Sequence, residues 1–445
     1  MTELFILDIA ILALTVLLLI FNKLNYVLFL SIPLMYNPFY SVILNTFGFR
    51  YSWIRVVFCV AYLGILYFYV FLRSVVGTKI HRKRTPLDAF LYIFGVIILL
   101  SMFVGIVRGN EYREVLAEVF PLFEWGAFFI IAGWLAENER QIKITIYCMF
   151  GWVLLVSIFN IFYFSTHGSA FEFKVDVGGG VFPRINDFIY AVLWPLFFVY
   201  YIYEDNFKRK LLWVFILIVG CVNVLLSSFR SVWLGVLIST LLCLVLSARK
   251  GFKLKAVQLI VLLLALFGLV YYSGSLDMLY GDINLSEAIV FRMQGEGLYQ
   301  GSSLTGRLAT YQIMLEQSLH IPYLFVGHGF GSYFDQYSLL PVSSAPNFFI
   351  NMLYEFGLFG FGFLVFILAR IYLDLFRIYN TRLTPYVNKL TVGVLGSYTC
   401  LGVVLCIFPA LYNFPLAAIG AMLLAFCYQL DTSNESRSAE TVHSD

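Results

Sequence analysis

The sequence predicts an all-α, polytopic integral membrane protein with about 12–14 transmembrane helices. Three observations support this fold class. Hydrophobic residues make up 61% of the 445 residues, charged residues only 12%, and the mean hydropathy is +0.86. A soluble domain carries about 25% charged residues. Apolar runs of about 20 residues, the length that crosses a bilayer, recur along the whole chain.

Counting such runs predicts thirteen membrane helices, near residues 4–22, 25–45, 52–75, 87–107, 116–136, 144–165, 187–203, 211–228, 231–248, 256–272, 346–371, 391–411 and 414–430. The first run begins with acidic residues and has no basic segment before it, so we interpret it as an uncleaved first helix. Residues 1–430 are therefore expected to form a single transmembrane domain, and the polar segment 431–445 a disordered cytoplasmic tail.

The distribution of lysine and arginine predicts the orientation of these helices. Basic residues concentrate in five connections, at residues 81–84, 137–143, 204–210, 249–255 and 370–389. An even number of predicted helices lies between each of these connections and the next, so all five can face the cytoplasm. The longest outward connection, 273–345, has only two arginines, Arg292 and Arg307, and no lysine. Within it, residues 302–319 show helical apolar spacing and are expected to form an amphipathic helix on the outer membrane face.

Composition also excludes several classes of function. The net charge of +3 is too small to indicate a nucleic-acid partner. The seven cysteines all lie in apolar runs without a CxxC pair, and the five histidines are scattered. The sequence therefore predicts no metal site and no other cofactor.

Four arginines lie at the outer ends of predicted helices or in outer connections, where the orientation rule should deplete them: Arg108, Arg184, Arg230 and Arg307. A single arginine there could simply extend to headgroup phosphate. Arg230 is harder to explain in this way, since it lies between two long apolar runs, where a charge costs about 2.5 kcal/mol or more. Guanidinium groups bind phosphate with two parallel hydrogen bonds, so several of them would suit a lipid-linked diphosphate.

Other outward residues are candidates for the same site. His328, in the glycine-rich stretch LFVGHGFGSYF (324–334), is a candidate base or hydrogen-bonding group, or an ordinary interfacial histidine. That stretch favours a tight outer turn close to a ligand. Glu355 lies well inside an apolar run and must be protonated, paired or facing a cavity. Asp187 and Glu118 are weaker candidates, and the glycines 178–180 indicate a flexible outer loop.

The order of these stretches resembles the O-antigen ligase and O-antigen polymerase family of bacterial envelope enzymes. The matching pieces are RGN (108–110), Arg184 with Asn186 and Asp187, SSFRSVWLGVL (227–237), TGRLATYQIMLEQSLHIPYLFVGHGFGSYF (305–334) and PNFFINMLYEFGLFG (346–360). The most specific part spans residues 184–360, which we expect to be the catalytic core region.

This resemblance implies a metal-independent glycosyltransferase that takes glycan from undecaprenyl diphosphate on the outer face of the bacterial cytoplasmic (inner) membrane. Arg230 and Arg307 would grip the diphosphate, with Arg184, Arg108, Asn347 and Asp187 as further substrate-binding residues and Glu355 and His328 as catalytic candidates. The family often has a His-Asn pair where this chain has Pro346-Asn347. The usual candidate base is therefore missing, which counts against ligase activity.

Four functions follow in order of preference. The first is a polymerase of lipid-linked repeat units for O-antigen, capsule or exopolysaccharide, to which a chain-length regulator would be a partner. The second is a ligase that joins finished glycan to lipid A core. A flippase is less favoured because the chain shows no internal repeat, and a structural scaffold is disfavoured by the buried charges at Arg230 and Glu355.

Overall fold

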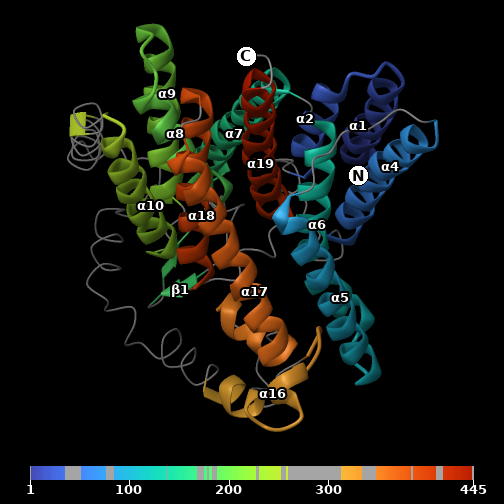
Figure 1. The fold of residues 1–445 in the computed structure, drawn as a ribbon. Coiled ribbons are helices and arrows are strands. Elements are labelled where there is room, and N and C mark those ends of the chain that lie inside the picture. The colour runs from blue at the N-terminus through green and yellow to red at the C-terminus, as the bar shows by residue number, and fades with distance from the viewer. Residues whose placement is uncertain are drawn as a thin grey trace.

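The computed structural model describes residues 2–35, 52–76, 85–136, 138–167, 175–177, 180–182, 188–226, 230–251, 257–258, 312–332, 347–381, 384–406 and 414–442. The elements are α1 (Thr2–Ile20), α2 (Leu24–Met35), α4 (Ser52–Val75), α5 (Pro86–Val107), α6 (Tyr112–Leu135), α7 (Glu139–His167), β1 (Val175–Val177), β2 (Gly180–Phe182), α8 (Phe188–Ile202), α9 (Phe207–Leu226), α10 (Arg230–Arg249), α16 (Tyr323–Val326), α17 (Phe348–Asn380), α18 (Pro385–Leu405) and α19 (Phe414–Val442). Long helices dominate the molecule (Figure 1), which confirms the predicted all-α class.

Within these ranges, seven helices are long and apolar enough to cross a membrane. The protein is therefore a multi-pass membrane protein. Most of the predicted runs coincide with an observed helix, and the run 52–75 has the bounds of α4. Several predicted features lie outside the described residues: Arg184, Asp187, Arg307, the run 256–272 apart from residues 257 and 258, and residues 273–311 of the predicted outer connection. The total of thirteen spanning helices thus stays a prediction.

Local capping signals explain where two of the helices begin. Thr85 precedes Pro86, and the Thr85 backbone N–H donates to Asp88 Oδ2 at 2.9 Å, which closes a capping box at the start of α5. Pro385 opens α18, and the Thr384 hydroxyl accepts from the Val387 N–H at 3.4 Å. Because of this cap, α18 begins six residues before the predicted run at 391.

Two predictions for polar segments differ from the structure. The region around the glycines 178–180, expected to be a flexible loop, contains an antiparallel hairpin in which Val175 pairs with Phe182 and Val177 with Gly180. The segment after residue 430, expected to be disordered, continues α19 as far as Val442. That segment contains neither glycine nor proline, so its sequence offers no stop signal to the helix.

Helix α8 lies at the centre of one group of helices and packs on α9, α10 and α18. Residues 189–200 of α8 are all buried. Within a bilayer no hydrophobic driving force brings helices together, so they associate through close packing, which small residues permit. A methyl group at Gly396 of α18 would lie 2.5 Å from Pro195 Cβ, and one at Gly235 of α10 would lie 3.0 Å from the Cys400 carbonyl oxygen.

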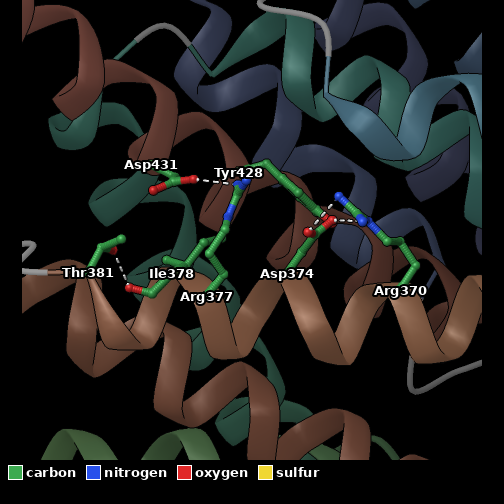
Figure 2. A network of polar contacts seen from close by, with 7 residues as sticks. All are labelled: Arg370, Asp374, Arg377, Ile378, Thr381, Tyr428 and Asp431. Atoms are coloured by element: carbon green, nitrogen blue, oxygen red, sulfur yellow. Dashed lines mark hydrogen bonds and ion pairs between the residues drawn. The ribbon is translucent and has the colours of Figure 1, made fainter.

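A polar network joins α17 to α19 and is drawn in Figure 2. Arg370 binds the Asp374 carboxylate through two nitrogens, at 3.1 and 3.0 Å, and the Tyr428 hydroxyl donates to Asp374 at 2.7 Å. One turn further on, Arg377 pairs with Asp431 at 3.1 Å. Asp374 and Asp431 are buried, so each arginine compensates a carboxylate that the apolar surroundings would otherwise disfavour.

Replacing Asp374 with alanine is expected to lower stability by about 1–3 kcal/mol, because the buried Tyr428 hydroxyl would lose its acceptor. Arg370 would lose its partner as well. Thermal unfolding of the purified variant in detergent measures the loss. Lys143→Ala is the matched control, since Lys143 and Glu139 form an i,i+4 pair that is much more exposed and worth about 0–1 kcal/mol. Equal stability of the two variants would contradict this account of the network.

The short helix α16 and the neighbouring ends of α5 and α17 form one end of the molecule, at the lower edge of Figure 1. Helix α17 packs on both α5 and α16. Basic residues occupy the starts of α7 and α9 and the ends of α10 and α17: Arg140, Lys143, Lys208, Arg209, Lys210, Arg249 and Arg377. Arg108, directly after α5, lies at the other end. This distribution matches the positive-inside pattern with α16 outside.

Candidate functional site

A break in helix α17 shapes the end of the molecule that carries α16. Gly357 has φ 66° and ψ −172°, which interrupts the helix between Glu355 and Gly360. The interruption frees backbone carbonyls for other partners. The Tyr354 carbonyl accepts from the His328 N–H at 2.7 Å, and the Glu355 carbonyl accepts from the Gly329 N–H and the Ser101 hydroxyl, both at 3.0 Å. The kink therefore docks the loop after α16 between α17 and α5.

The three glycines of this loop permit the docking. Gly327, Gly329 and Gly331 all have positive φ, between 72° and 80°, a region that favours glycine over residues with a side chain. Each also meets protein backbone: Gly327 that of α17, Gly329 that of α5 at Gly105, and Gly331 that of α6 at Val115. The sequence predicted a tight turn here, and the backbone that these glycines approach is that of the protein itself.

Two polar side chains anchor the end of the loop. The amide nitrogen of Asn110 donates to the Phe330 carbonyl at 2.8 Å and to the Ser332 hydroxyl at 3.3 Å. The Glu118 carboxylate accepts from the Gly331 N–H at 2.6 Å. Glu118, a weaker candidate in the sequence, thus holds the loop from α6, because a buried carboxylate satisfies a buried backbone donor.

Glu355 is buried, with 2% of its surface exposed, and its carboxylate accepts from the Asn351 side chain at 2.5 Å. A carboxyl group inside an apolar run must be protonated, paired or facing a cavity, and this bond gives the Glu355 carboxylate a polar partner. Asn347 lies one turn before Asn351. Its side-chain oxygen caps α17 by accepting from the N–H groups of residues 349 and 350, at 2.9 and 3.2 Å. Its nitrogen donates to the Cys406 carbonyl at 2.7 Å, so this side chain ties α17 to α18.

A stack of one cation and three rings stands at the surface of this end. The Arg108 guanidinium carbon lies 4.2 Å from the centroid of the Tyr323 ring. The Tyr323 and His328 rings stack with centroids 4.2 Å apart, and the His328 and Tyr354 rings with centroids 4.1 Å apart. The four residues come from α5, α16, the following loop and α17, so the stack forms only when all of these segments assemble.

His328 is held in this stack as a neutral ring. The pKa of His328 is lowered to about 4, mainly by burial and in smaller part by the nearby Arg108 charge, against the effect of a ring N–H that donates to the Gln317 carbonyl. Among the described residues no hydrogen-bond partner reaches its buried Nε2. At neutral pH the imidazole therefore stays uncharged, and its pKa is far from the value near operating pH that suits a general base.

The structure describes only part of the remaining predicted site residues. Arg230 is the first residue of α10, which places the backbone but not the side chain. Arg184, Asp187 and Arg307 lie outside the described residues. The structure thus brings Arg108, Glu118, His328 and Glu355 to one loop docking site, with Asn347 at the start of the same helix as Glu355. Their roles in catalysis or binding stay predictions.

Comparison with known protein families identifies the part of the chain that contains α10 and the kinked α17. Residues 213–365 match the family described as O-antigen ligase. The chain is similar to that family over these residues. The match confirms the resemblance that the sequence motifs carried, and it indicates a ligase-like or polymerase-like activity on glycans. No curated protein matches the chain.

The matched region also contains residues that the sequence analysis did not single out. Tyr323 and Tyr354 form the stack, and Asn351 binds Glu355. Aromatic residues make up 19% of this chain, so no composition signal distinguishes these two tyrosines from the others. Asn351 did carry a signal, because a polar residue four positions before a buried glutamate lies on the same helix face.

Proposed function

We propose that the protein is a polymerase of lipid-linked oligosaccharide repeat units, for O-antigen, capsule or exopolysaccharide. It would transfer glycan from undecaprenyl diphosphate to an acceptor sugar hydroxyl with inversion, on the outer face of the bacterial inner membrane. The observation that carries this proposal is the match of residues 213–365 to the O-antigen ligase family. The matched region is part of a multi-pass membrane protein, as a lipid-linked donor requires.

The choice of polymerase over ligase depends on one position. Where the family resemblance leads us to expect a His-Asn pair before α17, the chain has Pro346 and Asn347, while Glu355, Gly357 and Gly360 keep the rest of the pattern. The missing histidine favours polymerisation, because in the resembling proteins it is expected more strongly for ligation. A chain-length regulator is the proposed partner.

In the proposed reaction the acceptor hydroxyl oxygen attacks the anomeric carbon of the donor. The bond from that carbon to the diphosphate oxygen breaks, and the hydroxyl proton leaves to the departing diphosphate or to water. Arg230 and Arg307 would neutralise the charge that grows on the leaving group, with Arg184, Asp187 and Asn347 orienting the substrates. Fixed charge and orientation of two bound substrates would supply most of the acceleration.

Purified protein supplied with a synthetic lipid-diphosphate oligosaccharide, without nucleotide sugar, is expected to give a ladder of longer lipid-linked glycans. Gel electrophoresis of the products measures the ladder. A single addition to a lipid A core acceptor, with no ladder, would assign the protein as a ligase instead. Movement of the intact lipid-linked glycan across vesicles without bond formation would assign it as a flippase and overturn the proposal.

A further inference from the structure

We propose that Arg108 binds an oxyanion of the lipid-linked glycan, and that Tyr323, His328 and Tyr354 are positioning residues that act through it. The oxyanion is either the diphosphate of the carrier or a carboxylate carried by an acidic sugar. This inference rests on the proposed function for the identity of the ligand. The geometry that carries it is the stack of one guanidinium on three rings at the outer end of the molecule.

Stacking on Tyr323 does not occupy the N–H groups of the Arg108 guanidinium. A guanidinium carries five N–H donors, all of them in its plane. A ring that contacts its face takes none of these donors, so the rim stays available for a planar or tetrahedral oxyanion. Arg108 is exposed, and in the described part of the chain no carboxylate forms an ion pair with it. Its charge is thus held in place without being neutralised by an acidic side chain there.

The support beneath Arg108 is built from parts that are far apart in the chain. Tyr323 contacts the guanidinium, and the His328 ring fills the space between Tyr323 and Tyr354. The Gln317 carbonyl fixes the orientation of the His328 ring, and the Tyr354 hydroxyl donates to the Gln317 side chain at 3.3 Å. An arginine that only extends toward lipid headgroups needs no such support, because its chain is long enough to reach them alone.

The surroundings of the stack place it at the membrane surface. Leu319, Ile321, Phe325 and Val326, which flank Tyr323 in the chain, are exposed by 44–79% of their surface. In the separate helical stretch 312–318, before α16, Met314 is buried against Tyr354. An exposed apolar edge beside an exposed cation suits the boundary between hydrocarbon and water, where the phosphates of a lipid-linked glycan lie.

Binding measurements on the full-length protein in nanodiscs test this inference without requiring turnover. The probes are a polyprenyl diphosphate without sugar, the same carrier with a neutral oligosaccharide, and the same carrier with an oligosaccharide containing a uronic acid. Arg108→Ala is expected to weaken binding of at least one probe by about tenfold or more, the effect of losing a charge-assisted hydrogen bond. Loss with all three probes identifies the diphosphate as the oxyanion, and loss with the acidic probe alone identifies the sugar carboxylate.

Three further variants test the positioning role. Tyr323→Phe and His328→Phe keep a ring in the stack and are expected to bind like the wild type, whereas Tyr323→Leu removes the support and should weaken binding as Arg108→Ala does. The matched control is Arg73→Ala, which removes a guanidinium lying 5.6 Å from the Tyr69 ring centroid in helix α4. It should leave all three affinities unchanged. Unfolding temperatures of every variant identify any that fail to fold, and Arg108→Lys, which keeps the charge, should retain part of the affinity.

Several results would overturn the inference. Wild-type affinity of folded Arg108→Ala for all three probes would exclude oxyanion binding. A loss seen only in nanodiscs of anionic phosphatidylglycerol, and not in those of phosphatidylcholine, would assign Arg108 to bilayer headgroups. Loss of turnover in His328→Phe with unchanged affinity would give His328 a chemical role in place of the positioning role. If the wild type binds the probes but never joins them, the proposed polymerase fails while the oxyanion site stands.

Discussion

Replacing Arg230 or Arg307 with alanine is expected to abolish glycan transfer while leaving the protein folded. Each guanidinium is proposed to neutralise charge on the departing diphosphate, and loss of one such stabilising group typically lowers a rate by about 10²–10³-fold. The ladder assay with purified variants measures the loss, and thermal unfolding in detergent establishes that each variant is folded.

Two comparisons make this test specific for phosphate binding. Arg230→Lys keeps the charge but loses the planar two-pronged geometry, so its rate should fall between those of the wild type and Arg230→Ala. Arg140→Ala removes an exposed arginine at the start of α7, at the opposite end of the molecule, and should transfer glycan at the normal rate. Normal rates in both Arg230→Ala and Arg307→Ala would refute the assigned role.

The membrane helices could be predicted because the length of each apolar run can be read directly from the sequence. The run 52–75 became α4 with the same bounds, and the run 187–203 became α8 with a shift of one residue at each end. Boundaries were missed where a polar cap extends a helix beyond its apolar run. Thr384 and Pro385 start α18 well before residue 391, although both residues are recognisable helix-start signals.

The site was predicted only in part, because contacts between distant segments have no signature in a single sequence. Glu355 stood out as a carboxyl group in an apolar run, and its buried bond to Asn351 explains how it is accommodated. The Arg108 stack joins residues more than 200 positions apart, and neither periodicity nor composition links them. Asn347 was interpreted as a substrate ligand, yet an asparagine just before an apolar run is also an N-cap signal, which is the geometry that it adopts.

The glycines of the loop after α16 could be recognised as a turn motif from the sequence, but the physical reason for them could not. Gly327, Gly329 and Gly331 suggested a turn close to a ligand. Positive φ at all three supports the turn, while their close approach to α5, α6 and α17 gives the physical reason for glycine. The same logic applies to Gly357, whose place in the family pattern was noted from the sequence and whose backbone conformation creates the docking site.

Replacing Gly357 with alanine is accordingly expected to be strongly damaging at this end of the molecule. At φ 66° and ψ −172° the backbone occupies a region essentially restricted to glycine, in which another residue costs about 1–3 kcal/mol. The added methyl would also lie 2.5 Å from the Phe325 backbone carbonyl carbon, and overpacking of this kind adds about 1–3 kcal/mol. Thermal unfolding of the purified variant measures the sum.

The effect of Gly357→Ala should reach function through the loop rather than through loss of the whole fold. Relief of the clash requires α17 to straighten or the α16 loop to move away, and either change withdraws the Tyr354 and Glu355 carbonyls from the amides of His328 and Gly329. Arg108 would then lose the rings that hold it, so transfer should fall together with stability. Gly362→Ala, five residues further along α17, meets no atom within 4 Å and should be neutral or slightly stabilising, since alanine favours helix by up to about 1 kcal/mol. Equal behaviour of the two variants would mean that the kink does not hold the loop.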